Sequence, residues 1–142
     1  MNPPSTTLKY LSHRDELGPW LTAAGLTGAA VEVGTLYGAY ALKLLATWPG
    51  HLSCIDPWAN QDEATYFDWQ NKLDMNTVWA HAQAALGNHR RCTLLKMMSL
   101  EGAKRFGNWS LDAVYLDGNH KKEAARADIE AWFPKVKVGG IF

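Results

Sequence analysis

Short apolar runs alternate with stretches whose apolar residues recur at helical spacing, and this alternation limits the possible folds more than any other feature. The runs lie at 29–33, 52–55, 92–98, 111–117 and 136–142. A run of four to eight apolar residues is typical of a strand buried on both faces. Strands that alternate with helices predict βαβ units with right-handed crossovers. We therefore predict an α/β fold whose mostly parallel sheet carries helices on both faces.

The helical stretches fill the gaps between these runs. The first holds Leu17, Trp20, Leu21 and Ala24, and it either begins or kinks at Pro19. The remaining helices are predicted at 37–48, 75–86, 99–106 and 125–133. With 142 residues, no internal repeat and no linker, the chain is expected to form a single domain, 1–142.

The charge balance argues against a nucleic-acid partner. The chain has fourteen basic and fourteen acidic side chains, whereas a protein that neutralises phosphates usually has a basic surplus. The densest basic cluster, 89–91, is interpreted as a solvated loop. No run approaches the roughly 20 apolar residues that cross a bilayer, and the first ten residues lack the apolar core of a signal peptide. We predict a cytoplasmic protein that does not enter membranes, with Cys54 and Cys92 as buried, reduced thiols.

The stretch VEVGTLYG, 31–38, joins the first strand to its helix and is the candidate ligand turn. In open α/β sheets, ligands bind beyond the carboxyl ends of the strands. Gly34 and Gly38 can adopt left-handed dihedrals and let a ligand lie against bare backbone. The pattern is G-x-x-x-G, not the G-x-G-x-x-G of dinucleotide sites. The alternative is that both glycines serve a tight turn and close helix packing.

Asp56 follows the second strand, twenty-two positions after Gly34. A carboxylate at this place can accept hydrogen bonds from both hydroxyls of an adenosine ribose. The alternative is an Asp that ends a strand in an ordinary turn. The next segment, 57–70, has no clear period and mixes aromatic with acidic residues, as a functional lid or an ordinary surface connection would. Tyr37, Trp58 and Trp69 either shape a substrate pocket or pack the core.

Asp117 and His120 follow the fourth strand as D-x-x-H and therefore lie at the same sheet edge as the glycine turn. His120 could deprotonate a hydroxyl, with Asp117 either orienting the imidazole or binding a divalent cation. The alternative is that Asp117 ends the strand and His120 begins the next helix. Asp128 lies on that helix; its spacing from Lys121 and Lys122 favours a surface charge over a site residue.

Four stretches together resemble the class I S-adenosylmethionine-dependent methyltransferases, in particular the small-molecule O-methyltransferases of methyltransferase family 24. They are VEVGTLYG, CIDPW at 54–58, KMMSLEGAKRF at 96–106 and YLDGNHKKEAARADIEAWFPKVKVGG at 115–140. The resemblance covers 29–142 and implies a Rossmann-like sheet of seven strands. The chain is then expected to supply four strands and the edge of the fifth.

The resemblance also implies a set of site residues. Asp56 holds the ribose hydroxyls, and Met98 with Ser99 flanks the adenine. The full implied cofactor set is Glu32, Gly34, Thr35, Gly38, Asp56, Met98, Ser99 and Asp117. In related sugar and catechol O-methyltransferases the residue matching Asp117 binds magnesium, and D-x-x-H families place a catalytic His at the position of His120.

These observations favour methyl transfer from S-adenosylmethionine to a hydroxyl of a small molecule, with Mg²⁺ as a candidate second cofactor. Two alternatives stay open: a nucleotide-dependent oxidoreductase of Rossmann type, and a module that binds the nucleoside without turning it over. The apolar terminus, VKVGGIF, would leave an exposed sheet edge, so we expect a homo-oligomer or poor solubility.

Overall fold

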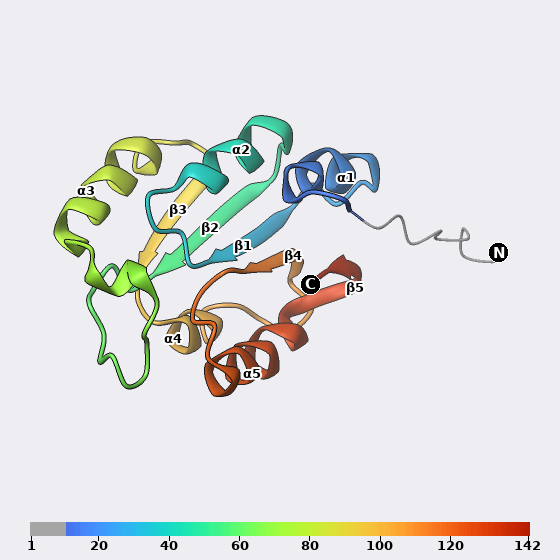
Figure 1. Ribbon diagram of the computed structural model, residues 1–142. Helices are drawn as coiled ribbons and strands as arrows, with labels where there is room; N and C mark the ends of the chain where they lie inside the picture. The colour runs from blue at the N-terminus through green and yellow to red at the C-terminus, as the bar shows by residue number, and fades with distance from the viewer. Residues whose placement is uncertain (1–10) are drawn as a thin grey trace.

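The computed structural model describes residues 11–142, in which five parallel strands form the central sheet (Figure 1). The strands are β1 (Ala29–Val33), β2 (His51–Asp56), β3 (Cys92–Lys96), β4 (Leu111–Leu116) and β5 (Val136–Ile141). Their spatial order is β3-β2-β1-β4-β5. The chain therefore builds outward from one side of β1 and then crosses to its other side, which creates a switch point between β1 and β4. The predicted parallel α/β sheet is confirmed.

Helices cover both faces of the sheet (Figure 1). One face carries α1 (Leu17–Ala23), α2 (Ala39–Thr47) and α3 (Met75–Leu86). The other carries α4 (Ser99–Ala103) and α5 (Lys122–Trp132). Short 3₁₀ turns complete the set: Arg14–Glu16, Trp69–Lys72 and Phe133–Lys135. Pro19 is the third residue of α1, in its first turn, where a missing N–H removes no hydrogen bond within this helix.

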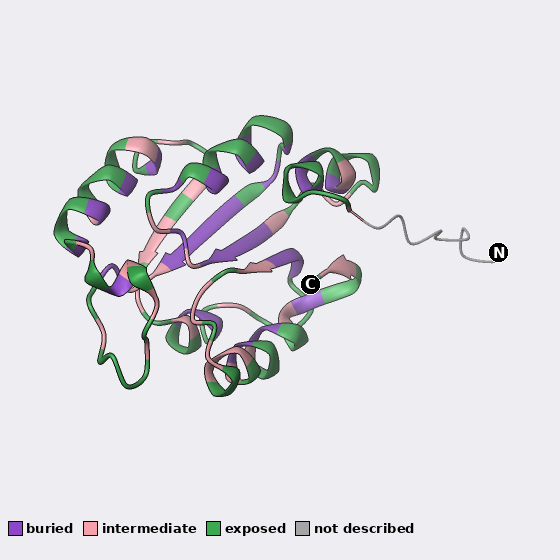
Figure 2. Ribbon diagram, in the orientation of Figure 1, coloured by how far each residue is buried: buried purple, intermediate pink, exposed green. Residues whose placement is uncertain are grey.

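Two apolar layers sandwich the sheet because successive strand residues point to opposite faces (Figure 2). Ala30 and Leu52 pack with Leu21 and Leu44 of the α1–α2 layer. Val31, Val33, Ile55 and Val114 pack on the opposite face with Ala103 of α4 and Trp132 of α5. The strands β1 and β2 are almost wholly buried, which explains why they read as continuous apolar runs in the sequence.

Arg91 corrects the interpretation of 89–91 as a solvated loop. Its Nη1 donates to the carbonyl oxygens of Trp48, at 2.6 Å, and Gly50, at 3.2 Å, and its Nη2 donates to that of Leu45, at 2.8 Å. The guanidinium thus satisfies carbonyl groups at the carboxyl end of α2, which have no partner within the helix. Arg90 beside it is exposed, as the sequence predicted.

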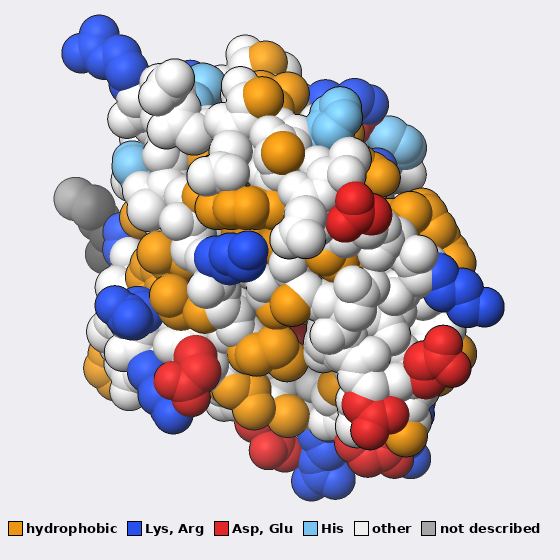
Figure 3. Space-filling view, turned by 90° about the vertical axis from the view of Figure 1, so that its left-hand side faces the viewer, with side chains coloured by type: hydrophobic (Ala, Val, Ile, Leu, Met, Phe, Trp, Pro, Cys, Tyr) orange, Lys and Arg blue, Asp and Glu red, His pale blue; other side chains and the backbone are white. Residues whose placement is uncertain are grey.

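Cys54 is buried and Cys92 half-buried; the two free thiols lie 3.7 Å apart on neighbouring strands. No helix within residues 11–142 has the length and apolar character needed to cross a membrane. The first ten residues, for which the sequence predicted no signal peptide, lie outside the described part. On the side that carries α3 and the connection from β2, basic and acidic side chains are interspersed around apolar ones (Figure 3).

Candidate functional site

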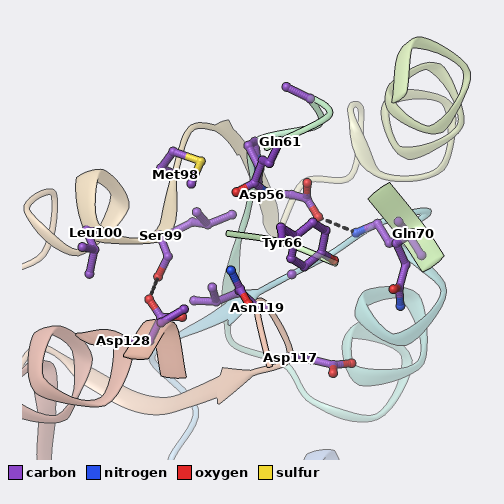
Figure 4. A pocket seen from close by; sticks show the side chains of 18 of the residues that line it. Asp56, Gln61, Tyr66, Gln70, Met98, Ser99, Leu100, Asp117, Asn119 and Asp128 are labelled. Atoms are coloured by element: carbon purple, nitrogen blue, oxygen red, sulfur yellow. Dashed lines mark hydrogen bonds between the residues drawn. The ribbon is translucent and has the colours of Figure 1, made fainter. Parts of the chain in front are cut away.

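A cavity of about 470 Å³ opens at the carboxyl ends of the strands, beside the switch point (Figure 4). Strands β1 and β2, the 57–74 connection, the start of α3, α4, the loop after β4 and α5 all contribute to its wall. Of the residues predicted from the sequence, the structure brings five together in this wall: Gly34, Asp56, Met98, Ser99 and Asp117. Glu32, Thr35, Gly38 and His120 are not part of it.

Gly34 is the point where the β1–α2 turn and the end of β4 come closest. Its φ is +88°, and its N–H donates to the carbonyl of Ile55 at 2.8 Å. The N–H of Asp117 donates to the carbonyl of Val33, also at 2.8 Å. A β-carbon on Gly34 would stand 2.0 Å from the carbonyl oxygen of Asp117. Only glycine fits, and it leaves bare backbone facing the cavity.

Gly38 does not line the cavity and instead begins α2. Its φ is also +88°, and it precedes the first residue of α2. A β-carbon there would stand 2.6 Å from Cδ1 of Leu86 on α3. Gly38 therefore sets the start of α2 and its approach to α3, which matches the packing alternative raised for this glycine.

Glu32 lies beneath the turn and not in the cavity. The residue is 2% exposed, and its Oε2 accepts a hydrogen bond from Oγ1 of Thr35 at 3.0 Å. Burial raises the pKa of Glu32 to about 7, and the Thr35 hydroxyl offsets this only in part. Glu32 and Thr35 thus support the turn from behind.

Asp56 joins the end of β2 to the turn. Its Oδ2 accepts from the N–H of Leu36 at 2.9 Å, and its Oδ1 accepts from the N–H of Trp58 at 2.8 Å. Burial raises the pKa of Asp56, and these two N–H groups offset part of the rise. Each carboxylate oxygen still has a free lone pair, and the residue lines the cavity. Asp56 can therefore accept two further hydrogen bonds from a ligand.

Of the three aromatic residues that the sequence singled out near the turn, only Trp58 is buried in the core. The Nε1–H of Trp58 donates to the carbonyl of Leu36 at 2.8 Å, and the indole packs on Trp79 with ring centroids 4.5 Å apart. Trp58 is buried, whereas Tyr37 and Trp69 are exposed. None of Tyr37, Trp58 and Trp69 lines the cavity, so the packing alternative holds for Trp58.

His120 lies between two carboxylates, close to the cavity wall. Its Nε2 is 3.4 Å from Oδ1 of Asp117, and its Nδ1 is 3.4 Å from Oδ2 of Asp68. Asp117 also faces Arg14, whose Nη1 is 3.8 Å from Oδ2. The D-x-x-H spacing in the sequence predicted that His120 and Asp117 lie close together. It did not predict Asp68, because that residue belongs to the 57–74 connection, far from His120 in the chain.

The 57–74 connection closes one side of the cavity. Asn119 donates through Nδ2 to the carbonyl of Thr65 at 2.8 Å, and Lys121 donates through Nζ to that of Ala64. Five of its residues line the cavity: Pro57, Ala59, Gln61, Tyr66 and Gln70. Within the described residues, Oε1 of Gln70 is buried without a hydrogen-bond donor. The connection is therefore part of the site and more than a surface link.

Asp128 corrects the expectation of a surface charge. It is 7% exposed and lines the cavity from α5. Oγ of Ser99 donates to its Oδ1 at 2.5 Å and accepts from Nε1 of Trp132 at 2.9 Å. Burial raises the pKa of Asp128, and the Ser99 hydroxyl offsets part of this. These contacts join α4 to α5 at one end of the cavity (Figure 4).

The donor set around Asp117 does not suit magnesium. Mg²⁺ requires a near-octahedral set of oxygen ligands, whereas Asp117 is flanked by an imidazole and a guanidinium. Across residues 11–142, no three His, Cys, Asp or Glu side chains converge as a metal site. The expected metal role of Asp117 has no support in the structure.

The strand order, the glycine turn after β1 and the acidic residue at the end of β2 are features of a Rossmann-like fold, the fold of the class I methyltransferases. The family comparison agrees: a family model described as "Methyltransferase domain" matches residues 31–142. The chain belongs to this family, methyltransferase family 24, and the family implies S-adenosylmethionine as its cofactor.

Solved structures share the fold at low sequence identity. A candidate caffeoyl-CoA O-methyltransferase from Staphylococcus aureus superposes with a TM-score of 0.64 and 14% identity, covering 93% of this chain and 57% of its own. A candidate S-adenosyl-L-methionine-dependent methyltransferase from Methanococcus maripaludis superposes with a TM-score of 0.57 and 15% identity. The superposition covers 87% of this chain and 51% of that protein. The chain thus spans about half the length of these proteins.

One curated relative is the uncharacterized protein y4gI of Sinorhizobium fredii. It is 29% identical over 124 residues, which are 84% of this chain and 13% of that protein. This chain therefore corresponds to a small part of a much longer relative.

Proposed function

We propose that this chain binds S-adenosylmethionine in the cavity and methylates a hydroxyl group of a small molecule. The observation that carries the proposal is that Gly34 and Asp56 face one cavity at the switch point of the sheet. A carboxylate that can accept two hydrogen bonds, next to a turn of bare backbone, suits a ribose with its two hydroxyls.

The remaining wall also fits the parts of this cofactor. Apolar side chains of Met98 and Leu100 offer contact surface for a flat base. The orphaned Oε1 of Gln70 needs a donor, which an amino group of a ligand would supply. A cavity of about 470 Å³ also lies within the size range of ligand sites that enclose a small molecule.

When bound, S-adenosylmethionine supplies a methyl group activated by a positively charged sulfur. His120 would take the proton of the acceptor hydroxyl, because its imidazole stands next to the cavity. Nδ1–H would face Asp68, which would orient the ring and stabilise its positive charge after proton transfer, whereas Nε2, on the side of Asp117 and the cavity, would be the nitrogen that takes the proton. The acceptor is proposed to be a small molecule in the cytoplasm.

The test is isothermal titration with S-adenosylhomocysteine, run in parallel with NAD. We expect binding of S-adenosylhomocysteine alone. Asp56→Ala should weaken it about 10- to 100-fold, because one charge-assisted hydrogen-bond pair is lost. Glu63→Ala, an exposed carboxylate on the 57–74 connection, serves as the control and should bind as the wild type does.

Two outcomes would contradict the proposal. Preference for NAD would favour an oxidoreductase, and no binding of either molecule by a folded sample would exclude the cavity as a cofactor site. Because Asp56 also holds the N–H groups of Leu36 and Trp58, Asp56→Asn should be titrated too. Circular dichroism of each variant separates lost binding from lost folding.

A further inference from the structure

We propose that residues 61–70 form a gate over the cavity, held shut by Asn119 and Lys121, and that closing the gate places Asp68 against His120. The inference rests on the proposed function, because the gate covers the same cavity and positions the same base. It goes beyond that function in two respects. It assigns Asn119 and Lys121 as positioning residues, and it makes the orientation of the base depend on a closed site.

The gate is a loop whose two ends are bonded to each other. Nδ2 of Asn60 donates to the carbonyl groups of Asn71, at 2.6 Å, and Leu73, at 3.0 Å. The side chain of Asn71 accepts from the N–H of Gln61 and donates to the carbonyl of the same residue, both at 2.7 Å. A compact loop that is closed by its own side chains can move as one body about its two ends.

Two side chains from the segment between β4 and α5 hold the gate. Nδ2 of Asn119 donates to the carbonyl of Thr65 at 2.8 Å, and Nζ of Lys121 donates to that of Ala64. The same ammonium lies 5.2 Å from the centre of the Phe67 ring. In the described part of the chain, the hydrogen bonds that join the gate to elements outside its own connection come from these two side chains. Breaking them and the cation–π contact would free the loop.

The gate also carries two buried acceptors that have no hydrogen-bond donor, Oδ2 of Asp68 and Oε1 of Gln70. No other buried side-chain nitrogen or oxygen within residues 11–142 is in this state. Oδ2 of Asp68 is 3.4 Å from Nδ1 of His120, just beyond hydrogen-bond length. Gln70 lines the cavity on the side opposite Leu100 (Figure 4). A small further closure onto a ligand would satisfy both atoms, which otherwise cost free energy.

The gate and the base are coupled because Asn119, His120 and Lys121 are consecutive residues. While Asn119 and Lys121 hold the gate, Asp68 faces Nδ1 of His120 and orients the ring. When the gate opens, Asp68 moves away with it, and a ligand enters a site whose base is not oriented. Closure then encloses the ligand and completes the base in one movement.

The first experiment needs no ligand and follows chymotrypsin cleavage at Phe67 by mass spectrometry. Lys121→Ala removes the hydrogen bond to Ala64 and the cation–π contact, so this cleavage should become about 3- to 10-fold faster. Lys121→Arg keeps a donor and a cation and should restore most of the wild-type rate. Lys122→Ala removes the same charge from the next, exposed residue and should change nothing. Cleavage at Trp109, exposed on another loop, reports global unfolding.

The second experiment follows binding of S-adenosylhomocysteine by stopped-flow fluorescence. A gate limits entry and exit alike, so Lys121→Ala should raise the association and dissociation rate constants together by about 3- to 10-fold. Kd should change by about threefold or less, because Lys121 does not line the cavity. In the bound protein, ¹⁵N NMR of the neutral His120 ring should show the Nδ1–H tautomer in the wild type and a smaller share of it in Lys121→Ala.

Each outcome decides one part of the proposal. Cleavage at Phe67 that does not rise, or that rises equally at Trp109, would overturn the hold of Lys121 on the gate. An unchanged association rate constant would overturn the gate as the route of the ligand, and an unchanged tautomer would overturn its action on His120. If the wild type does not bind S-adenosylhomocysteine, the proposed function fails, and the cleavage experiment still decides whether Lys121 holds the loop.

Discussion

The carbonyl oxygen of Asp117 lies 2.0 Å from the point where a β-carbon on Gly34 would stand. This contact joins the turn after β1 to the end of β4, the two elements that border the switch point. Neither backbone can withdraw easily, because the N–H of Gly34 bonds to Ile55 and the N–H of Asp117 bonds to Val33. The close approach of these two segments beside the cavity therefore requires that residue 34 has no β-carbon.

Gly34→Ala should lower the free energy of unfolding by about 3 kcal/mol, because it combines a left-handed φ with a backbone clash. Urea unfolding measures the change. Gly25→Ala has φ +72° but open space around the added carbon, so it should cost only about 1 kcal/mol. Equal costs at the two positions would show that the contact with Asp117 does not matter.

Glu32 should make stability depend on pH. Its folded pKa of about 7 lies above the ordinary 4.5, so the folded state binds a proton more tightly than the unfolded state between these values. Stability is then fully present below about pH 4.5 and falls as pH rises through 7, by about 3 kcal/mol in all.

Glu32→Gln removes this titration while keeping an acceptor for Thr35. Denaturant unfolding from pH 5 to pH 8 should give a flatter profile for the variant than for the wild type. Asp56 and Asp128, whose pKa values are also raised, remain in both proteins, so the difference between the profiles reports Glu32 together with its coupling to Asp56. Parallel profiles would show that Glu32 does not titrate in this range.

Arg91→Ala should lower stability by about 2 kcal/mol, because the carbonyl groups of Leu45, Trp48 and Gly50 lose a charged donor. Thermal unfolding followed by circular dichroism measures the loss. Arg91→Lys should recover only part of it, since an ammonium cannot reproduce the fork of the guanidinium. Arg90→Ala, at the exposed neighbour, should stay within about 0.5 kcal/mol of the wild type.

We propose that this chain associates with a second copy through β5. Within the described residues β5 is an edge strand, Val138 is 97% exposed, and Phe133 and Phe142 lie exposed beside each other. Light scattering should find a dimer, and Val138→Lys should shift it toward the monomer. A wild type that stays monomeric at high concentration would argue against this interface.

The sequence by itself determined the order of the elements and the place of the site. Local spacing is enough to distinguish a buried strand, as in 29–33, from an amphipathic helix, as in 75–86. Gly34 and Asp56 could be predicted because Gly34 directly follows β1 and Asp56 is the last residue of β2, and parallel strands bring their carboxyl ends to one edge. The end of α4 at Ala103 and not at 106 is a boundary that spacing does not fix.

Only the tertiary structure decided which polar groups the site contains. Spacing places Asp128 on the same helix face as Lys121, but packing of α5 against α4 turns that face toward the cavity and not toward solvent. Asp68 meets His120, and Arg91 meets the end of α2, through contacts between segments far apart in the chain. A local pattern reports the period of a segment, whereas burial of a charge depends on which neighbour packs over it.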